Sequence, residues 1–143
     1  MSVGEVCQRH VVTIGPDESV RAAAKKMDAE GVGSVVVVDA ELRPVGILTD
    51  RDIAMRVLRR QRNADETCVS EVMTDDVMTL RESASLRTGL GRLRSDGVRR
   101  APVLDSGGHL VGIFAVEDAL AYIARDVSAA SQVAGAQRAL STA

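Results

Sequence analysis

The sequence predicts an α/β (α+β) protein made of two β-α-β-β-α repeats that pack together as one pseudo-twofold module. Three observations support this prediction: an internal repeat without gaps, apolar patterns that alternate between strand and helix periods, and a length of 143 residues. That length suits one compact domain, or two small ones that share a core. One repeat alone is too small to bury its sheet, so we expect the two copies to cover each other.

The internal repeat divides nearly the whole chain into two similar parts. Residues Glu30–Ala54 align with Asp96–Leu120 without a gap, and the same register extends toward both ends of each copy. Chance similarity in composition does not hold one register over so many positions. The predicted organisation is a first repeat at 3–59, a polar linker at 60–68, a second repeat at 69–125 and an Ala/Ser-rich tail at 126–143.

The first half of each repeat predicts a short strand and an amphipathic helix. In the first repeat the strand covers Val11–Ile14, and Ser19 is placed to cap the helix that follows. Four apolar residues from Val20 to Met27 have the i, i+3, i+4, i+7 spacing of a buried helix face. Gly31 stands where a helix end favours a left-handed residue. The equivalents in the second repeat are Val77–Leu80, Ser85, Leu86–Leu93 and Gly97.

The second half of each repeat predicts a hairpin and a closing helix. Val35–Val38 is a continuous β-branched run, which is typical of a strand buried on both faces. A second strand covers Val45–Leu48, and the closing helix begins at Asp50. In the second repeat these elements fall at Ala101–Leu104, Val111–Phe114 and Glu117–Arg125. The tail from Ser128 predicts a marginal helix, either frayed or docked on a partner.

The composition argues against several classes of protein. A net charge of −2 and an aromatic content of 1% disfavour nucleic acid as the main partner. Neither a membrane span nor a secretory signal is visible, so we expect a cytoplasmic protein without membrane contact. Cys7 and Cys68 lie far apart and outside any zinc-ligand or CxxC spacing. We therefore expect two reduced thiols and no metal site.

Three motifs make the sequence resemble a tandem pair of CBS domains, a Bateman-type module named for cystathionine β-synthase. They are VGILTDRDIA at Val45–Ala54, VGIFAVEDAL at Val111–Leu120 and GVRRAPVLD at Gly97–Asp105. The gapless duplication is itself typical of that family. The resemblance implies a regulatory module that binds AMP, ADP, ATP or S-adenosylmethionine in clefts between the repeats. It also implies a homodimer formed through the helices.

The family pattern G-h-x-[ST]-x-x-[DN] falls on Gly46–Asp52 in the first repeat. The resemblance assigns the ribose hydroxyls to Asp52 and a ribose or phosphate oxygen to Thr49. A carboxylate one turn into a helix can accept both hydroxyl hydrogens of a ribose, and free N–H groups at the helix start suit a phosphate. The alternative is that Thr49 or Asp50 caps the helix and Asp52 complements the helix dipole.

The resemblance completes the same site with residues from both repeats. Arg99 and Arg100 would reach phosphate oxygens across the pseudo-twofold axis, because the arginine fork binds such oxygens in pairs. Val77 and Met78 would line the adenine together with Ile47. The alternatives are two solvated surface arginines and three ordinary core residues.

The second repeat departs from the family pattern at its equivalent site. It keeps the acid as Asp118 but has Ala115 in place of the hydroxyl residue, and Glu117 adds a charge that would repel phosphate. We therefore expect a weak or empty site there. Asp118 could equally serve only as an acid in the first turn of a helix.

Three interpretations of function follow. The leading one is a non-catalytic sensor that binds an adenine nucleotide and passes its state to an unknown target protein on a separate chain. The second is a ligand-free module of the same fold that dimerises or docks. The third, an enzyme, lacks support because His10 and His109 align with no nucleophile or metal constellation.

Overall fold

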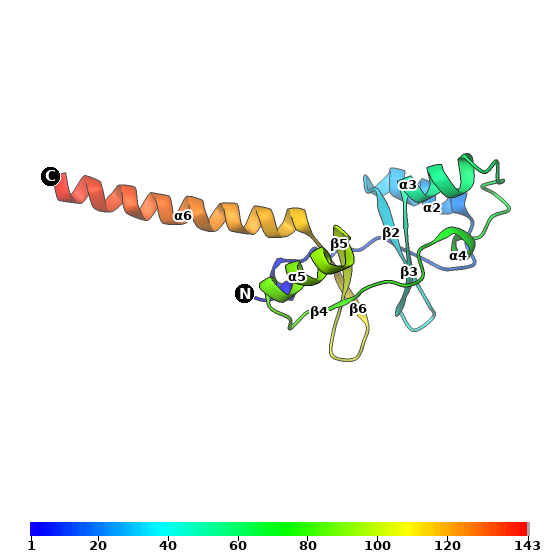
Figure 1. The fold of residues 1–143 in the computed structure, drawn as a ribbon, viewed down its shortest axis with the longest axis horizontal. Helices are drawn as coiled ribbons and strands as arrows, with labels where there is room; N and C mark the ends of the chain where they lie inside the picture. The colour runs from blue at the N-terminus through cyan, green and yellow to red at the C-terminus, as the bar shows by residue number, and fades with distance from the viewer. Residues whose placement is uncertain (143) are drawn as a thin grey trace.

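The computed structural model describes residues 1–142 and arranges them as two similar halves, each with a three-stranded sheet and covering helices (Figure 1). The α+β class predicted from the sequence is confirmed. The first half contains α1 (Val3–Val6), β1 (Thr13–Ile14), α2 (Val20–Glu30), β2 (Ser34–Val38), β3 (Pro44–Thr49), α3 (Asp50–Ile53) and a π-helical continuation, η1 (Ala54–Leu58). The second half contains α4 (Val69–Val72), β4 (Leu80–Arg81), α5 (Leu86–Asp96), β5 (Arg100–Leu104), β6 (Leu110–Ala115) and α6 (Val116–Thr142).

Both sheets have the same topology. The central strand, β2 or β5, pairs in parallel with a two-residue strand and antiparallel with the last strand of its repeat. All five residues of β2 are buried, as its continuous apolar run predicts. The equivalent strand β5 differs at its first residue, Arg100, which is exposed.

The caps of the two long helices in the repeats follow the sequence signals. The Oγ of Ser19 accepts a hydrogen bond from the Ala22 N–H at 3.1 Å, and Ser85 does the same for Thr88. Gly31 ends α2 with a φ of 64°, and Gly97 ends α5 with a φ of 65°. Both glycines therefore adopt the left-handed conformation that few other residues take without strain.

Two four-residue helices, α1 and α4, exchange places between the repeats, which the sequence pattern did not predict. Helix α1 belongs to the first repeat in sequence but contacts α5, β4, β6 and α6 of the second. Helix α4 makes the reciprocal contact with β3 of the first repeat. Fully buried Val3 lies in the core of the second half, and Val69 lies in the core of the first. Each hydrophobic core is therefore built from both repeats.

The segments that follow these helices pair with the last strand of the opposite repeat. Gln8 and Ile113 exchange two backbone hydrogen bonds of 2.9 Å, and the equivalent pair, Thr74 and Ile47, exchanges two of 3.0 Å. Gly112 allows this approach, because a Cβ there would lie 2.9 Å from the Gln8 carbonyl oxygen. The glycine in the second VGI motif therefore serves the contact between repeats.

The linker predicted at 60–68 is folded against the first repeat. The Thr67 carbonyl accepts a hydrogen bond from the Val20 N–H, and the Ala64 carbonyl accepts one from Arg21. These carbonyls satisfy N–H groups that the first turn of α2 leaves without helical partners.

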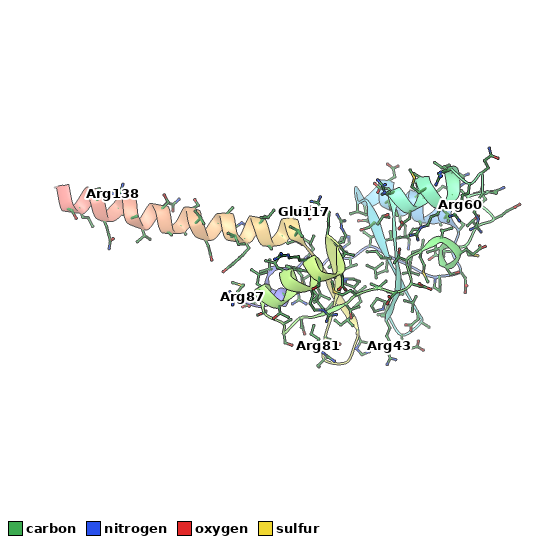
Figure 2. All side chains as sticks on the ribbon, in the orientation of Figure 1. Arg43, Arg60, Arg81, Arg87, Glu117 and Arg138 are labelled. Carbon is green, nitrogen blue, oxygen red and sulfur yellow. The ribbon has the colours of Figure 1, made fainter. Side chains whose placement is uncertain are left out.

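Helix α6 joins two elements that the sequence predicts separately. The sequence predicts a closing helix that ends near Arg125 and a marginal helix from Ser128, but the structure has one unbroken helix that reaches Thr142. It extends about 40 Å, with its far part away from both sheets and Arg138 near its end (Figure 2). No helix of residues 1–142, α6 included, combines the length and apolar character that a membrane crossing requires. Residue 143, the last of the predicted tail, lies outside the described residues.

We predict that truncating the exchanged helices destabilises the opposite repeat. Val3→Ala should lower the free energy of unfolding by about 2 kcal/mol, because it removes two buried methyl groups and leaves a cavity. In native-state hydrogen exchange, the amides of β5 and β6 should lose more protection than those of β2 and β3. Val69→Ala should produce the opposite pattern.

The matched control is Val133→Ala, since Val133 is 63% exposed on α6. This variant should leave the melting temperature unchanged. If Val3→Ala weakened amide protection mainly in β2 and β3, helix α1 would not have the stabilising effect on the second repeat that we assign to it.

Candidate functional site

Two cavities lie between the repeats, at equivalent places about the pseudo-twofold axis. The Met78 cavity, of about 390 Å³, has Ile47, Thr74, Val77, Met78, Val98 and Arg100 among its lining residues. The Asp118 cavity, of about 530 Å³, has Gln8, Val12, Ser34, Arg100, Ile113 and Asp118 among its lining residues. Both volumes fall in the range of small-molecule sites. The crossing residues Gln8 and Thr74 form part of the two walls.

The Met78 cavity brings together four of the residues predicted for a nucleotide site. Ile47 comes from β3 of the first repeat, Val77 and Met78 precede β4, and Arg100 begins β5. The apolar side chains offer surface for a flat ring, and the guanidinium offers N–H donors at the same cavity. Asp76 and Asp96 also line it, so the wall contains both signs of charge.

Thr49 ends the strand that carries Ile47, and Asp52 lies in the first turn of helix α3, where the two residues cap that helix. The Asp52 N–H donates to the Thr49 Oγ1 at 3.1 Å, and the Thr49 N–H donates to the Asp52 Oδ2 at 3.0 Å. The capping alternative therefore describes both residues in this structure, and neither lines the Met78 cavity. Their contact with a ligand remains a prediction.

Arg56 is a residue of this region that the sequence analysis missed. Its Nη1 donates to the Val72 carbonyl at 2.9 Å and to the Thr74 Oγ1 at 3.4 Å, and its Nη2 lies 3.7 Å from the Asp52 Oδ1. It thus joins the helix of Asp52 to the exchanged segment in the cavity wall. The repeat gave no signal for it, because the equivalent residue is Tyr122.

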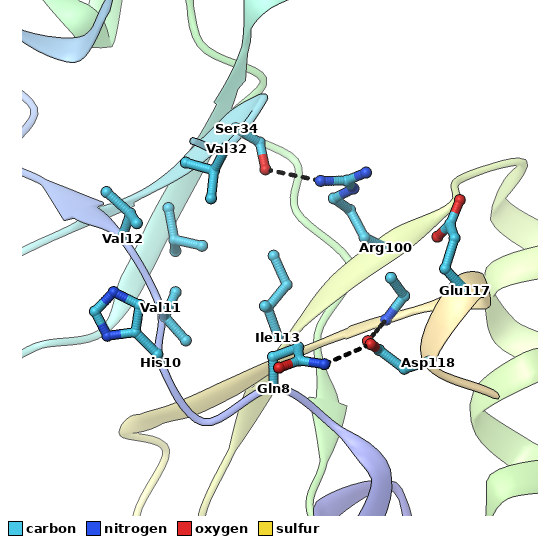
Figure 3. A pocket seen from close by; sticks show the side chains of 12 residues that line it. Gln8, His10, Val11, Val12, Val32, Ser34, Arg100, Ile113, Glu117 and Asp118 are labelled. Carbon is cyan, nitrogen blue, oxygen red and sulfur yellow. Dashed lines mark hydrogen bonds between the residues drawn. The ribbon is translucent and has the colours of Figure 1, made fainter. Parts of the chain in front are cut away.

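The two arginines predicted to act together have different surroundings. Arg100 lines both cavities, and its Nη1 donates to the Ser34 Oγ at 3.2 Å (Figure 3). Arg99 lines neither cavity and forms an ion pair with the Glu117 carboxylate. Hydrogen bonding from its own backbone N–H, together with Arg99, holds the pKa of Glu117 below its ordinary value. The predicted contact of Arg99 with a phosphate remains a prediction.

Asp118 is more heavily engaged than Asp52. Its Oδ2 accepts from the Ala115 N–H, and its Oδ1 accepts from the Gln8 Nε2, both at 2.9 Å (Figure 3). Glu117 lines the same cavity and adds a second carboxylate. A ligand hydroxyl at Asp118 must therefore share or displace Gln8, whereas the Asp52 Oδ1 has only the longer contact with Arg56.

The cysteines and possible metal ligands form no further site in the described chain. Cys7 and Cys68 are both free thiols, and burial raises the pKa of the Cys7 thiol. Burial therefore favours the protonated, unreactive form. No group of three or more His, Cys, Asp or Glu side chains within residues 1–142 is arranged to hold a metal ion.

Comparison with known proteins identifies the family. A model described as the CBS domain matches residues 3–59 and 69–125. The chain belongs to the CBS-domain family. The tandem CBS pair inferred from the three motifs is thereby confirmed, and CBS pairs are regulatory modules.

The similarity to relatives and to solved structures extends over both CBS domains. The uncharacterized protein MK0525 of Methanopyrus kandleri is 37% identical over 120 residues, which are 84% of this chain and 61% of that protein. The chain thus spans less than two thirds of this relative. The CBS-domain structure NE2398 has a TM-score of 0.76 and 31% identity, with 86% of this chain and 97% of that one covered.

A second similar structure contains ligands. The CBS domain pair of protein MJ0100, in complex with 5′-methylthioadenosine and S-adenosyl-L-methionine, has a TM-score of 0.77. It covers 88% of this chain and 98% of that one at 23% identity, which establishes a common fold.

We predict that Arg56 holds the exchanged segment against the first repeat. Arg56→Ala should cost about 1 kcal/mol of stability, since it removes a charge-assisted hydrogen bond to a backbone carbonyl on a partly exposed side chain. The melting temperature should fall by about 2 to 4 °C. Arg51→Ala, an exposed arginine five residues earlier on the same helical stretch, is the matched control. Equal melting temperatures for the two variants would contradict this role.

Proposed function

We propose that this CBS pair is a non-catalytic sensor that binds an adenine nucleotide between its repeats, with the Met78 cavity as the principal site. The ligand is AMP, ADP, ATP or S-adenosylmethionine, and the bound state is passed to a target protein on a separate chain. The observation that carries the proposal is the meeting of Ile47, Val77 and Met78 with Arg100 in one cavity. An apolar slot beside a guanidinium suits a purine and a phosphate together.

The Asp52 carboxylate supplies the next step of the proposal. It lies at the end of β3 beyond Ile47 and keeps an oxygen, Oδ1, whose nearest charged partner is Arg56 at 3.7 Å. In the proposed complex this oxygen accepts a hydrogen bond from a ribose hydroxyl. The Thr49 hydroxyl forms a hydrogen bond with a neighbouring ribose or phosphate oxygen of the ligand. The capping bonds of both residues involve backbone N–H groups, so they leave lone pairs for the ligand.

The second repeat supports a weaker site. Ala115 offers no hydroxyl, Glu117 places a carboxylate in the wall, and Gln8 already bonds to Asp118. The MJ0100 pair, which shares the fold, binds adenosine-containing molecules, and this likeness makes adenine-type ligands suitable candidates. The choice among them rests on the experiment below.

A ligand-free dimerisation or docking module is the second candidate. Exposed apolar side chains on the helices favour it, among them Leu58 at 68% exposure, Leu120 at 60% and Val127 at 64%. Such side chains commonly mark contact surfaces. A homodimer that also binds nucleotide is compatible with both candidates, and we include it in the proposal.

We predict that an adenine nucleotide stabilises the fold. A ligand at about 100 times its dissociation constant adds about 2.7 kcal/mol to the stability of the folded state. The melting temperature should therefore rise by about 5 to 10 °C, as measured by thermal shift with AMP, ADP, ATP and S-adenosylmethionine separately. An unchanged melting temperature with all four at millimolar concentration would favour the ligand-free module.

The two acids provide a matched pair of variants. Asp52→Ala and Asp118→Ala each remove one carboxylate that accepts from the backbone N–H three residues earlier. Each variant also loses one further contact, with Arg56 for Asp52 and with Gln8 for Asp118, so a melt without ligand measures the stability of each. Calorimetry should show at least a tenfold loss of AMP affinity for Asp52→Ala and little change for Asp118→Ala. A larger loss for Asp118→Ala would move the principal site to the Asp118 cavity.

A further inference from the structure

Arg100 has a position that no other charged residue of the described chain shares. It begins β5 on the side that faces the first repeat, and its side chain reaches Ser34 at the start of β2. It lines the Met78 cavity and the Asp118 cavity at once. Figure 3 shows the guanidinium beside Ser34, joined to the Ser34 hydroxyl by a hydrogen bond. One cation is therefore common to both walls.

Among residues 1–142, Arg100 is the only lysine or arginine that lines either cavity. The other charged lining residues include Asp76 and Asp96 on one side, and Glu117 and Asp118 on the other. His10 also lines the Asp118 cavity, but its Nε2 lies 3.1 Å from the Glu30 carboxylate. A phosphate in either cavity would therefore depend on the same guanidinium.

The pseudo-twofold axis explains why a single arginine serves two sites. The residue equivalent to Arg100 in the first repeat is Ser34, and the two are hydrogen-bonded to each other across the axis. A symmetric module would place one basic residue from each repeat at this point. Here the first repeat contributes a hydroxyl that is 8% exposed, so the chain has one cation for two phosphates.

We propose that Arg100 couples the two cavities, so that a phosphorylated ligand in one weakens the binding of a phosphorylated ligand in the other. This inference rests on the proposed function and adds how binding in one cavity affects binding in the other. If the guanidinium turns toward the first phosphate, its N–H donors are lost to the second. If it stays between them, two like charges approach each other across one cation. Both arrangements give negative coupling, and by linkage the effect is reciprocal.

The coupling is a property of phosphate and not of the nucleoside. Adenosine has no group that needs Arg100, so its two binding steps should differ only through local features such as Thr49 and Ala115. The two AMP binding steps should show this same difference. In addition, the second AMP should bind more weakly because the first already holds Arg100. A charge-assisted hydrogen bond changes affinity by about tenfold or more. The ratio of the second to the first dissociation constant should therefore be about ten times larger for AMP than for adenosine.

The test is calorimetric titration of the full chain with AMP and, separately, with adenosine. The expected result is two steps for each ligand, with the wider separation for AMP. Equal separations for AMP and adenosine would overturn the coupling and leave the proposed function intact. Binding of only one adenosine per chain would also overturn it, because no second ligand would then compete for the arginine. If neither ligand binds, the proposed function itself fails.

Arg100→Ser provides the matched variant, because it copies the residue of the first repeat into the second. AMP should then bind both cavities more weakly, and the separation of its two steps should fall to that of adenosine. Arg87→Ser, at an exposed arginine of α5 away from both cavities, should keep the separation of the parent chain. An AMP separation that survives Arg100→Ser would exclude Arg100 as its cause. A thermal melt without ligand checks that the variant is folded. If the variant unfolds, the comparison of AMP with adenosine on the parent chain still tests the coupling.

Discussion

The exchange of the N-terminal segments is the contact on which the rest of the molecule depends. Val3 and Val69 are fully buried in the core of the repeat to which they do not belong in sequence. Neither half therefore has a complete core without the other. Burial of apolar surface is the main stabilising term in folding, so the two repeats are bound to fold as one body although each has its own sheet.

The same exchange builds the cavities. The crossing residue Gln8 pairs with Ile113, and Thr74 pairs with Ile47, and each pair also lines a cavity. The walls of the candidate sites are thus formed where the two repeats pair with each other, and we call these two contacts the seams. A ligand in either cavity would contact both repeats and change the strength of that seam. This geometry suits a regulatory module, because binding then acts on the packing of the whole body and not on one loop.

The departures from twofold symmetry gather around these seams. The two cores differ mostly by one apolar residue replacing another, such as Val20 and Leu86. Around the cavities the chemistry changes instead: Thr49 is matched by Ala115, and Ser34 by Arg100. The Thr49 hydroxyl and the Arg100 cation each lack a counterpart of the same kind in the other repeat. The fold therefore offers two similar spaces with unequal polar groups, which is the physical basis for unequal occupancy.

The sequence by itself determined the duplication, the caps at Ser19 and Gly31 and the buried strand β2. Local patterns carry these features, because caps, strand burial and repeat register depend on residue type and spacing. The meeting of Ile47 with Met78 followed only from the resemblance to CBS pairs, since the residues alone also fit an ordinary core. Only the tertiary structure decided the exchange of α1 and α4. A helix of four residues is too short to show a periodicity, and an apolar face does not say which surface covers it. The pairing of Arg99 with Glu117 and the contacts of Arg56 were likewise decided by long-range approach, which no spacing along the chain encodes.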